Sequence, residues 1–224
     1  MDVGGTFTDF TLFEENKNYL LNYKTPSTPN EPAEAVENGL IYLIKEYDID
    51  PLTINYLGHG TTVALNMLLE QRAKSIGLLT TKGFRDVLEI GRQTRPNLYN
   101  YEIKRPEPLA KRSHRIEIPE RINVDGIVQL PLDHGVVEQA ALDFLNNDIE
   151  AIAICFLHSY KNANHEIQAA EIIRNTLPNA FLSLSSEVLP EFREYERTST
   201  TAVNTYVGPR MQLYLQKLKE RIAR

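Results

Sequence analysis

The sequence contains one cysteine, no apolar run long enough to span a membrane and no excess of positive charge. A single cysteine permits no intramolecular disulfide, which favours a reducing compartment. No apolar stretch approaches the roughly 20 residues of a membrane-spanning helix, and no signal peptide precedes the first motif. Lys and Arg number 24 against 30 Asp and Glu, so a net charge of -6 offers no basic surface to nucleic acid or anionic lipid. We therefore predict a cytoplasmic protein that binds neither nucleic acid nor membranes.

Internal repeats and low-complexity segments are also absent from the sequence. The composition, 42% hydrophobic and 24% charged, is typical of a globular protein, and 224 residues suffice for one large domain or two small ones. The cysteine, Cys155, lies in the apolar run 151–157. This setting is more typical of a buried structural thiol than of a nucleophile.

The first nine residues predict a hairpin that binds a phosphate. Gly4 and Gly5 would form its turn, because glycine adopts positive φ and lets an anion approach the backbone. Successive N–H groups would line a concave anion site, to which Thr6 and Thr8 add hydroxyl donors. Asp2, at the end of the preceding strand, would hold Mg²⁺ through water or orient an attacking group against a terminal phosphate. An ordinary β-turn with glycines is the alternative interpretation.

The next segment predicts a strand meander followed by a helix. We expect a strand over 17–24 and a helix over 31–47, with Asn30 as the N-cap and Pro32 in the first turn. A short strand over 54–58 would follow.

A second glycine and hydroxyl turn comes next, formed by His59, Gly60, Thr61 and Thr62. It would open a helix from Val63 to about Gln71, and such a helix N-terminus is a ready anion site. Ordinary capping by Thr61 or Thr62 is an equally open interpretation.

The remaining pattern alternates strands and helices, which is typical of α/β architecture. The run 150–156 is almost entirely apolar, as expected for a strand buried on both faces, and 123–126 has the signal of a hairpin turn. We expect strands over 74–80, 113–122, 127–130, 150–156 and 180–183, and helices over 84–90, 134–147, 164–176 and 191–224, the last interrupted near Gly208-Pro209.

A long irregular loop is predicted between residues 91 and 108. Arg92 and Arg95 lie in it, and their guanidinium groups would clamp a carboxylate or phosphate through paired hydrogen bonds. Solvated arginines, or arginines paired with Glu89 or Glu102, are the alternative.

Five motifs, in this order, resemble the amino-terminal part of the ATP-hydrolysing subunit of the hydantoinase A and 5-oxoprolinase family. They are Asp2-Val3-Gly4-Gly5-Thr6-Phe7-Thr8-Asp9, Gly58-His59-Gly60-Thr61-Thr62-Val63-Ala64-Leu65-Asn66, Gly91-Arg92-Gln93-Thr94-Arg95-Pro96 with Leu98-Tyr99, Leu157-His158-Ser159-Tyr160 with His165-Glu166, and Arg193-Glu194-Tyr195-Glu196-Arg197-Thr198.

The resemblance implies a fold and an activity. The fold would be one α/β lobe of the actin-like ATPase type, with a β-meander opening and flanking helices. The activity would be ATP-dependent opening of a cyclic amide such as 5-oxoproline or a hydantoin. It also implies two family domains, over 1–189 and from 190 to 224, and a partner subunit or domain of the hydantoinase B type. Assembly into a homo-oligomer is a further expectation.

The resemblance also assigns roles to residues. Asp2, Asp9, Arg92 and Arg95 would be catalytic, with Asp2 next to the metal; ATP and Mg²⁺ would be the cofactors. The cofactor-binding residues would be Gly4, Gly5, Thr6, Thr8, His59, Gly60, Thr61 and Thr62. His158 and His165 would be polar anchors or metal ligands. Glu194, Glu196 and Arg197 would either line the cleft or form a salt-bridged helix.

Three expectations limit these implications. We expect the first strand to be curtailed, the second lobe of the nucleotide site to lie outside this chain, and the chain alone to be inactive. Two further functions stay open. One is a small-molecule kinase of the same superfamily, and the other is a non-catalytic nucleotide-binding or assembly module.

Overall fold

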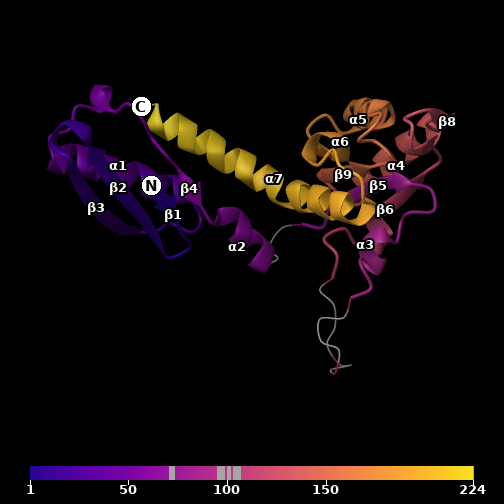
Figure 1. Cartoon of the computed structure of the whole chain (residues 1–224), viewed down its shortest axis with the longest axis horizontal. Helices are drawn as coiled ribbons and strands as arrows, with labels where there is room; N and C mark the ends of the chain where they lie inside the picture. The colour runs from indigo at the N-terminus through magenta and orange to yellow at the C-terminus, as the bar shows by residue number, and fades with distance from the viewer. Residues whose placement is uncertain (71–73, 95–98, 100–101, 103–106, 224) are drawn as a thin grey trace. The chain divides into compact units, whose positions relative to one another are not determined.

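The structure is a computed structural model that describes residues 1–70, 74–94, 99, 102 and 107–223. It divides into two compact units. Unit 1 comprises residues 1–72 and 210–224, and unit 2 comprises residues 73–209. Figure 1 labels the main helices and strands.

Unit 1 is built on a mixed four-stranded sheet in the order β3-β2-β1-β4. Its strands are β1 (Asp2–Val3), β2 (Phe7–Glu14), β3 (Tyr19–Pro26) and β4 (Gly60–Thr61). The first three strands form an antiparallel meander, as predicted, and β4 joins β1 in parallel. Strand β2 alternates between the two faces, burying Thr8 and Phe10 while Phe7 and Asp9 stay exposed.

Helices cover the buried face of this sheet. The helical elements of unit 1 are α1 (Pro32–Glu46), α2 (Val63–Glu70), the part of α7 (Glu194–Ile222) from residue 210 onward, and two short 3₁₀ helices, η1 (Glu15–Lys17) and η2 (Pro51–Thr53). Val3, Ala33, Val36, Tyr214 and Leu218 form a buried cluster that joins β1, α1 and α7. The apolar face of the meander is thereby removed from water, which is the main favourable contribution to folding.

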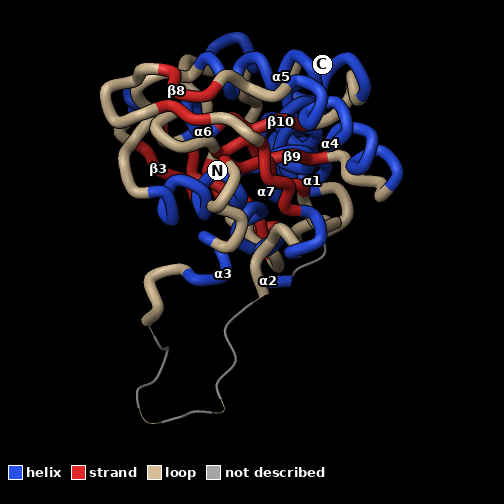
Figure 2. Tube along the Cα trace, turned by 90° about the vertical axis from the view of Figure 1, so that its right-hand side faces the viewer, coloured by secondary structure: helices blue, strands red, loops and turns tan. Residues whose placement is uncertain are grey.

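Unit 2 is built on a wholly parallel sheet in the order β10-β9-β5-β6. Its strands are β5 (Gly77–Thr81), β6 (Arg115–Ile118), β9 (Ala151–Cys155) and β10 (Phe181–Leu184). The helical elements are α3 (Val87–Ile90), η3 (Arg112–His114), α4 (His134–Asn146), α5 (Asn164–Thr176), α6 (Ser185–Val188) and α7 up to residue 209; a separate hairpin comprises β7 (Arg121–Ile122) and β8 (Val128–Leu130). Figure 2 colours these helices blue and the strands red.

Both faces of the parallel sheet are buried. Ile152 and Ile154 of β9 enter a core shared with α4 and α5. Cys155 is buried within reach of Thr198 and Thr201 of α7, and burial raises the pKa of its thiol to about 12. Such a thiol is neutral and inert at physiological pH, so the predicted structural role is supported.

Two predicted strands are placed differently in the structure. The strand predicted over 54–58 is wrong, because the strand beside β1 is Gly60–Thr61, where Gly60 N donates to Met1 O at 2.9 Å. The strand predicted over 113–122 is divided into β6 and β7 around Pro119, which lacks the N–H that a continuous ladder requires.

Two predicted helix signals are also corrected. Asn30 is not the N-cap of α1: Glu31 has that position and makes no side-chain capping bond, while the hydroxyl of Thr28 accepts from Ala35 N at 3.1 Å. Helix α7 continues through Pro209 without interruption. A Cβ at Gly208 would lie 2.2 Å from the ring of Phe181, so this glycine permits close packing and does not end the helix.

The α/β class predicted from the sequence is therefore confirmed. Among the described residues, no helix combines the length and the apolar character that crossing a bilayer requires.

Candidate functional site

Two carboxylates lie side by side on the exposed face of the unit 1 sheet. Asp2 and Asp9 occupy directly opposite positions in the β1–β2 register, and both side chains are exposed. Opposite residues in such a pair have Cβ atoms about 5 Å apart. Gly60 pairs with Asp2 on the other side, and Lys24 Nζ lies 3.1 Å from Asp9 Oδ1. The strand register therefore brings together two predicted site residues that are seven positions apart.

The glycine turn has the predicted position but not the predicted backbone conformation. Neither Gly4 nor Gly5 has positive φ, so the expected left-handed conformation is wrong. Glycine is required for space, because a Cβ would lie 2.9 Å from Phe7 O at position 4 and 3.1 Å from Asn66 Nδ2 at position 5. Gly4 N donates to Phe7 O at 3.0 Å, so the turn itself uses this amide.

The two threonines of the hairpin have different surroundings. Thr8 is fully buried, and its Oγ1 lies 2.9 Å from Ser27 Oγ, whose hydroxyl donates to Gly4 O at 2.8 Å. The Thr6 side chain is exposed. The Thr8 hydroxyl thus braces the hairpin on the covered face, and Thr6 is the threonine that a ligand reaches without rearrangement.

The second turn caps helix α2. Thr61 Oγ1 accepts from Val63 N at 3.1 Å and donates to Val3 O at 3.2 Å, while Thr62 O accepts from Asn66 N at 2.9 Å. The capping interpretation is confirmed for Thr61. Phosphate contacts by Thr61, Thr62 and Gly60 stay predictions.

His59 is held by a residue that the sequence did not reveal. Its Nε2 lies 2.8 Å from the hydroxyl of Tyr214 on α7, and its Nδ1 is buried with no hydrogen-bond partner. Burial lowers the pKa of His59, as does the amino-terminal charge, so the ring is neutral at pH 7. Burial also raises the pKa of Tyr214 to about 12. His59 therefore presents an uncharged ring.

A cavity of about 230 Å³ adjoins the glycine turn within unit 1. Its lining combines Gly4 and Gly5 with the first residues of α1 and α2 and with Arg210 and Lys217 of α7. Helix N-termini and cations favour an anionic ligand. Lys217 forms an ion pair with Glu31, and Glu70 is also in the lining, so carboxylates accompany the cations.

The predicted arginine clamp is described only in part. Arg92 donates from Nε and Nη2 to the two carboxylate oxygens of Glu196 at 2.7 and 2.6 Å, and this pairing lowers the pKa of Glu196. Arg95 lies outside the described residues. Arg92 is therefore a paired arginine in unit 2, and its contact with a substrate or phosphate stays a prediction.

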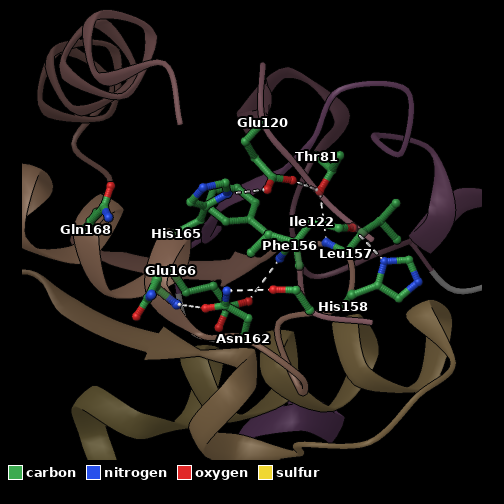
Figure 3. Close-up of polar contacts among 12 residues, drawn as sticks. Thr81, Glu120, Ile122, Phe156, Leu157, His158, Asn162, His165, Glu166 and Gln168 are labelled. Carbon is green, nitrogen blue, oxygen red and sulfur yellow. Dashed lines mark hydrogen bonds and ion pairs between the residues drawn. The ribbon is translucent and has the colours of Figure 1, made fainter. Parts of the chain in front are cut away.

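The histidines of the fourth motif hold neighbouring segments of unit 2 through hydrogen bonds, as Figure 3 shows. His165 Nδ1 lies 2.7 Å from Glu120 Oε2, and the other carboxylate oxygen of Glu120 accepts from the hydroxyl of Thr81. His158 Nδ1 donates to Ile122 O at 2.8 Å. No three His, Cys, Asp or Glu side chains of the described residues come together in a way that would hold a metal. The anchor interpretation is the one that these contacts support.

Glu166 and Arg197 complete this interior network. Glu166 is fully buried and accepts hydrogen bonds from Phe156 N, from Ser186 N and from the hydroxyls of Ser185 and Ser186, at 2.6 to 2.9 Å. Arg197 is 2% exposed and donates to Phe156 O at 2.7 Å. Arg197 thus serves the fold and does not line an open cleft.

Comparisons with known proteins identify relatives over the whole chain. The family model described as hydantoinase/oxoprolinase N-terminal region matches residues 1–177. An uncharacterized protein of Methanocaldococcus jannaschii is 43% identical over 219 residues, which are 96% of this chain and 32% of that protein. The caprolactamase subunit alpha of Pseudomonas jessenii is 38% identical over 224 residues, which are 97% of this chain and 32% of that subunit. The chain thus spans about a third of the length of these relatives.

Solved structures show the same fold. The crystal structure of the ATP-dependent caprolactamase from Pseudomonas jessenii matches with a TM-score of 0.86 and 35% identity, covering 99% of this chain and 34% of that chain. A nucleotide-free acetone carboxylase structure matches with a TM-score of 0.88 and covers 99% of this chain and 33% of that chain. Its identity of 24% supports the fold alone.

Proposed function

This chain belongs to the hydantoinase/oxoprolinase family, and we propose on that premise that it is the amino-terminal part of an ATP-dependent hydrolase that opens cyclic amides. A lactam or hydantoin ring is the proposed substrate class, in line with the caprolactamase relative.

The observation that carries the proposal is the constellation at the glycine hairpin of unit 1. The exposed carboxylates of Asp2 and Asp9 are direct neighbours across two strands. The turn that joins these strands borders a cavity whose lining holds Arg210 and Lys217 but neither aspartate. Carboxylates and cations beside one glycine turn suit a phosphate chain with its metal.

The donor set fits Mg²⁺ and ATP. Magnesium is typically held by one or two carboxylates, by phosphate oxygens and by several waters, which matches a site with Asp2 and Asp9 alone. Gly4, Gly5 and Thr6 would hold phosphate oxygens, with His59, Gly60, Thr61 and Thr62 on the neighbouring turn. When bound, ATP would supply a phosphoryl group to the amide oxygen, since an unstrained amide requires such activation.

The roles of this chain's residues follow from their charges. Asp2 and Asp9 would hold the cation and thereby orient the phosphate chain, a contribution made by position and charge. Arg92, released from Glu196, would bind a negatively charged oxygen with its two parallel N–H donors, together with Arg95.

The proposal extends to the architecture of the whole protein. Unit 1 would belong to a lobe of the actin-like ATPase type, with Asp2 near the metal. The family domain would end at residue 189 and a second would begin at 190. A hydantoinase B-type subunit or domain would complete the enzyme, and its location would be cytoplasmic.

The decisive experiment measures phosphate release by the complete protein with ATP and Mg²⁺. Caprolactam, 5-oxoproline, hydantoin and a panel of sugars are compared as substrates, and ring opening is followed by mass spectrometry. We expect ATP turnover that depends on one of the cyclic amides. Turnover with sugars that yields a phosphorylated product would contradict the proposal and favour a kinase.

Substitution of Asp2 tests the metal-facing carboxylate. Asp2→Asn in the complete protein should lower turnover at least about 100-fold, which is the order of loss on removing one electrostatic contact in an active site. Its melting temperature should change little, because the side chain is exposed. Asp48→Asn, another exposed aspartate of unit 1, serves as the control and should keep full turnover. Equal losses of turnover and melting temperature would assign Asp2 to the fold.

A further inference from the structure

A second cavity, of about 480 Å³, lies in unit 2 outside every residue assigned above to ATP or metal. Gly83, two residues after the end of β5, and Glu117, near the end of β6, both line it. Parallel sheets bind ligands beyond the carboxyl ends of their strands, and small-molecule sites typically have volumes of about 300–1,000 Å³. Position and size are therefore those of a small-molecule site.

One wall of this cavity carries a guanidinium that makes no hydrogen bond to the described residues. Arg85 lines the cavity half-buried, and no hydrogen bond or ion pair joins it to any residue of the described chain. The nearby Asp86 is already paired, since Arg112 donates to both its oxygens at 2.9 and 3.0 Å. The same carboxylate also faces buried Arg115, whose Nη1 lies 4.0 Å from Asp86 Oδ1. Arg85 attracts the Asp86 carboxylate through space and helps lower its pKa, but the N–H donors of Arg85 are left for a ligand.

The opposite charge is available from Glu117. Its Oε1 accepts from Gly83 N at 2.7 Å, while Oε2 accepts no hydrogen bond from the described residues. Phe84 and Val87 supply apolar lining to the same cavity. Besides the paired Arg112 and Asp86, the cavity therefore presents one cation, Arg85, one anion, Glu117, and an apolar surface.

We propose that this cavity binds a small linear amino acid, with its carboxylate at Arg85, its ammonium at Glu117 and its aliphatic chain against Phe84 and Val87. A guanidinium recognises a carboxylate through two parallel hydrogen bonds, and the aliphatic part gains from leaving water.

The identification of this ligand as a product rests on the proposed function. Hydrolysis of a lactam breaks the C–N bond, adds the water oxygen to the carbonyl carbon and places both water protons on the nitrogen, whereas a hydantoin would open to a carboxylate and an uncharged ureido group. The opened lactam then carries a carboxylate at one end and an ammonium at the other. The site in unit 2 is thus a product-binding site of the same enzyme.

The test uses the chain as it stands and needs no ATP. Titrations with 6-aminohexanoate, hexanoate and hexylamine are followed by calorimetry and by amide NMR. We expect saturable binding of 6-aminohexanoate, at least tenfold tighter than either single-ended compound, with shifts concentrated at residues 83–90 and 112–117. Hexanoate that binds as tightly as 6-aminohexanoate would overturn the proposal, as would the absence of binding.

Two variants and a control locate the site. Arg85→Gln and Glu117→Gln should each lower the affinity for 6-aminohexanoate at least tenfold. Glu117→Gln keeps an oxygen that accepts from Gly83 N–H and so preserves the local fold. Arg174→Gln, an exposed arginine of α5, should leave binding unchanged. Unchanged affinity in both cavity variants would refute the assignment.

The outcome is separable from that of the proposed function. If the protein binds 6-aminohexanoate but shows no amide-dependent ATP turnover, the binding site is confirmed and its role as a product site is refuted. Turnover without binding would overturn this inference alone.

Discussion

Unit 1 leaves its two candidate carboxylates at the surface, whereas unit 2 encloses the carboxylates of Glu120 and Glu166. Asp2 and Asp9 are exposed on one face of the unit 1 sheet. Glu120 and Glu166 of unit 2 are at most 1% exposed, and each has hydrogen-bond donors on both oxygens. A buried carboxylate with its acceptors filled has little left for a ligand, while an exposed pair keeps most of its capacity. The carboxylates of unit 1 are therefore open to a ligand, whereas those of unit 2 stabilise the fold.

The sheets of the two units differ in the same direction. The unit 1 sheet leaves one face exposed, with Phe7 at 45% and Phe13 at 55%. In unit 2 the sheet is buried on both faces, with Leu79, Ile152 and Ile154 fully inaccessible. Away from the sheets both units expose apolar side chains, such as Leu52 at 93% and Phe192 at 63%.

The largest effect is expected when the interior network of unit 2 is broken. Glu166→Ala leaves two backbone N–H groups and two hydroxyls without an acceptor, and the free energy of unfolding should fall by about 3–5 kcal/mol. Urea unfolding followed by circular dichroism measures the change. Glu171→Ala, an exposed glutamate on the same helix, should change stability by no more than about 0.5 kcal/mol. A loss below about 1 kcal/mol in Glu166→Ala would remove the contrast between the units.

An intermediate effect is expected at a tight contact of unit 1. A Cβ at Gly39 of α1 would lie 2.2 Å from the ring of buried Phe10, so Gly39→Ala should cost about 1–3 kcal/mol despite its better helix propensity. Gly135→Ala in α4 is the control, because the nearest atom is 3.6 Å away, and it should be neutral or stabilising by about 0.5 kcal/mol. Thermal unfolding of both variants tests whether the covered face of unit 1 is as closely packed as unit 2. Stabilisation of both would show that it is not.

The smallest effect is expected from pH. The pKa of His59 is lowered in the folded state, so its contribution to stability is complete above the unfolded pKa of about 6.5 and is lost as pH falls toward the folded value. His59→Gln should therefore flatten the loss of stability between about pH 6.5 and pH 5, by less than about 1 kcal/mol because solvent screens the half-buried ring. Urea midpoints at pH 7.5, 6 and 5 measure it, with His134→Gln, an exposed histidine of unit 2, as the control. Parallel pH curves for His59→Gln and the unmodified chain would contradict the expectation.

Elements whose signals lie within a few residues were predictable. The helix Asn164–Thr176 has its predicted bounds, and the turn over 123–126 is closed by Asn123 Oδ1, which accepts from Asp125 N and Ile127 N. In both, the stabilising groups are sequence neighbours.

Elements that depend on distant partners were not predictable. The strand beside β1 is fixed by pairing between Asp2 and Gly60, which no local pattern at residues 54–58 reveals. Likewise, Gly208 packs on Phe181, so a glycine and proline pair that usually ends a helix lies inside α7.

The candidate site divides in the same way. The glycine hairpin with its two aspartates was evident from nine consecutive residues, and the β1–β2 register brings the aspartates together. Tyr214, which holds His59, is 155 residues away, and nothing in the sequence around it indicates this contact. The inference of positive φ at Gly4 and Gly5 was wrong. A side chain at these positions would come too close to Phe7 O or to Asn66, which is why glycine suits them.

The burial of Cys155 gives this protein a built-in reporter. It is the only thiol in the chain and lies in β9, at the centre of unit 2, with a pKa of about 12. A thiol reagent at neutral pH can modify it only in molecules whose unit 2 has opened, so the rate of labelling measures that opening. Because unit 1 has no cysteine, it contributes no signal. Labelling therefore reports the opening of unit 2 without an engineered probe.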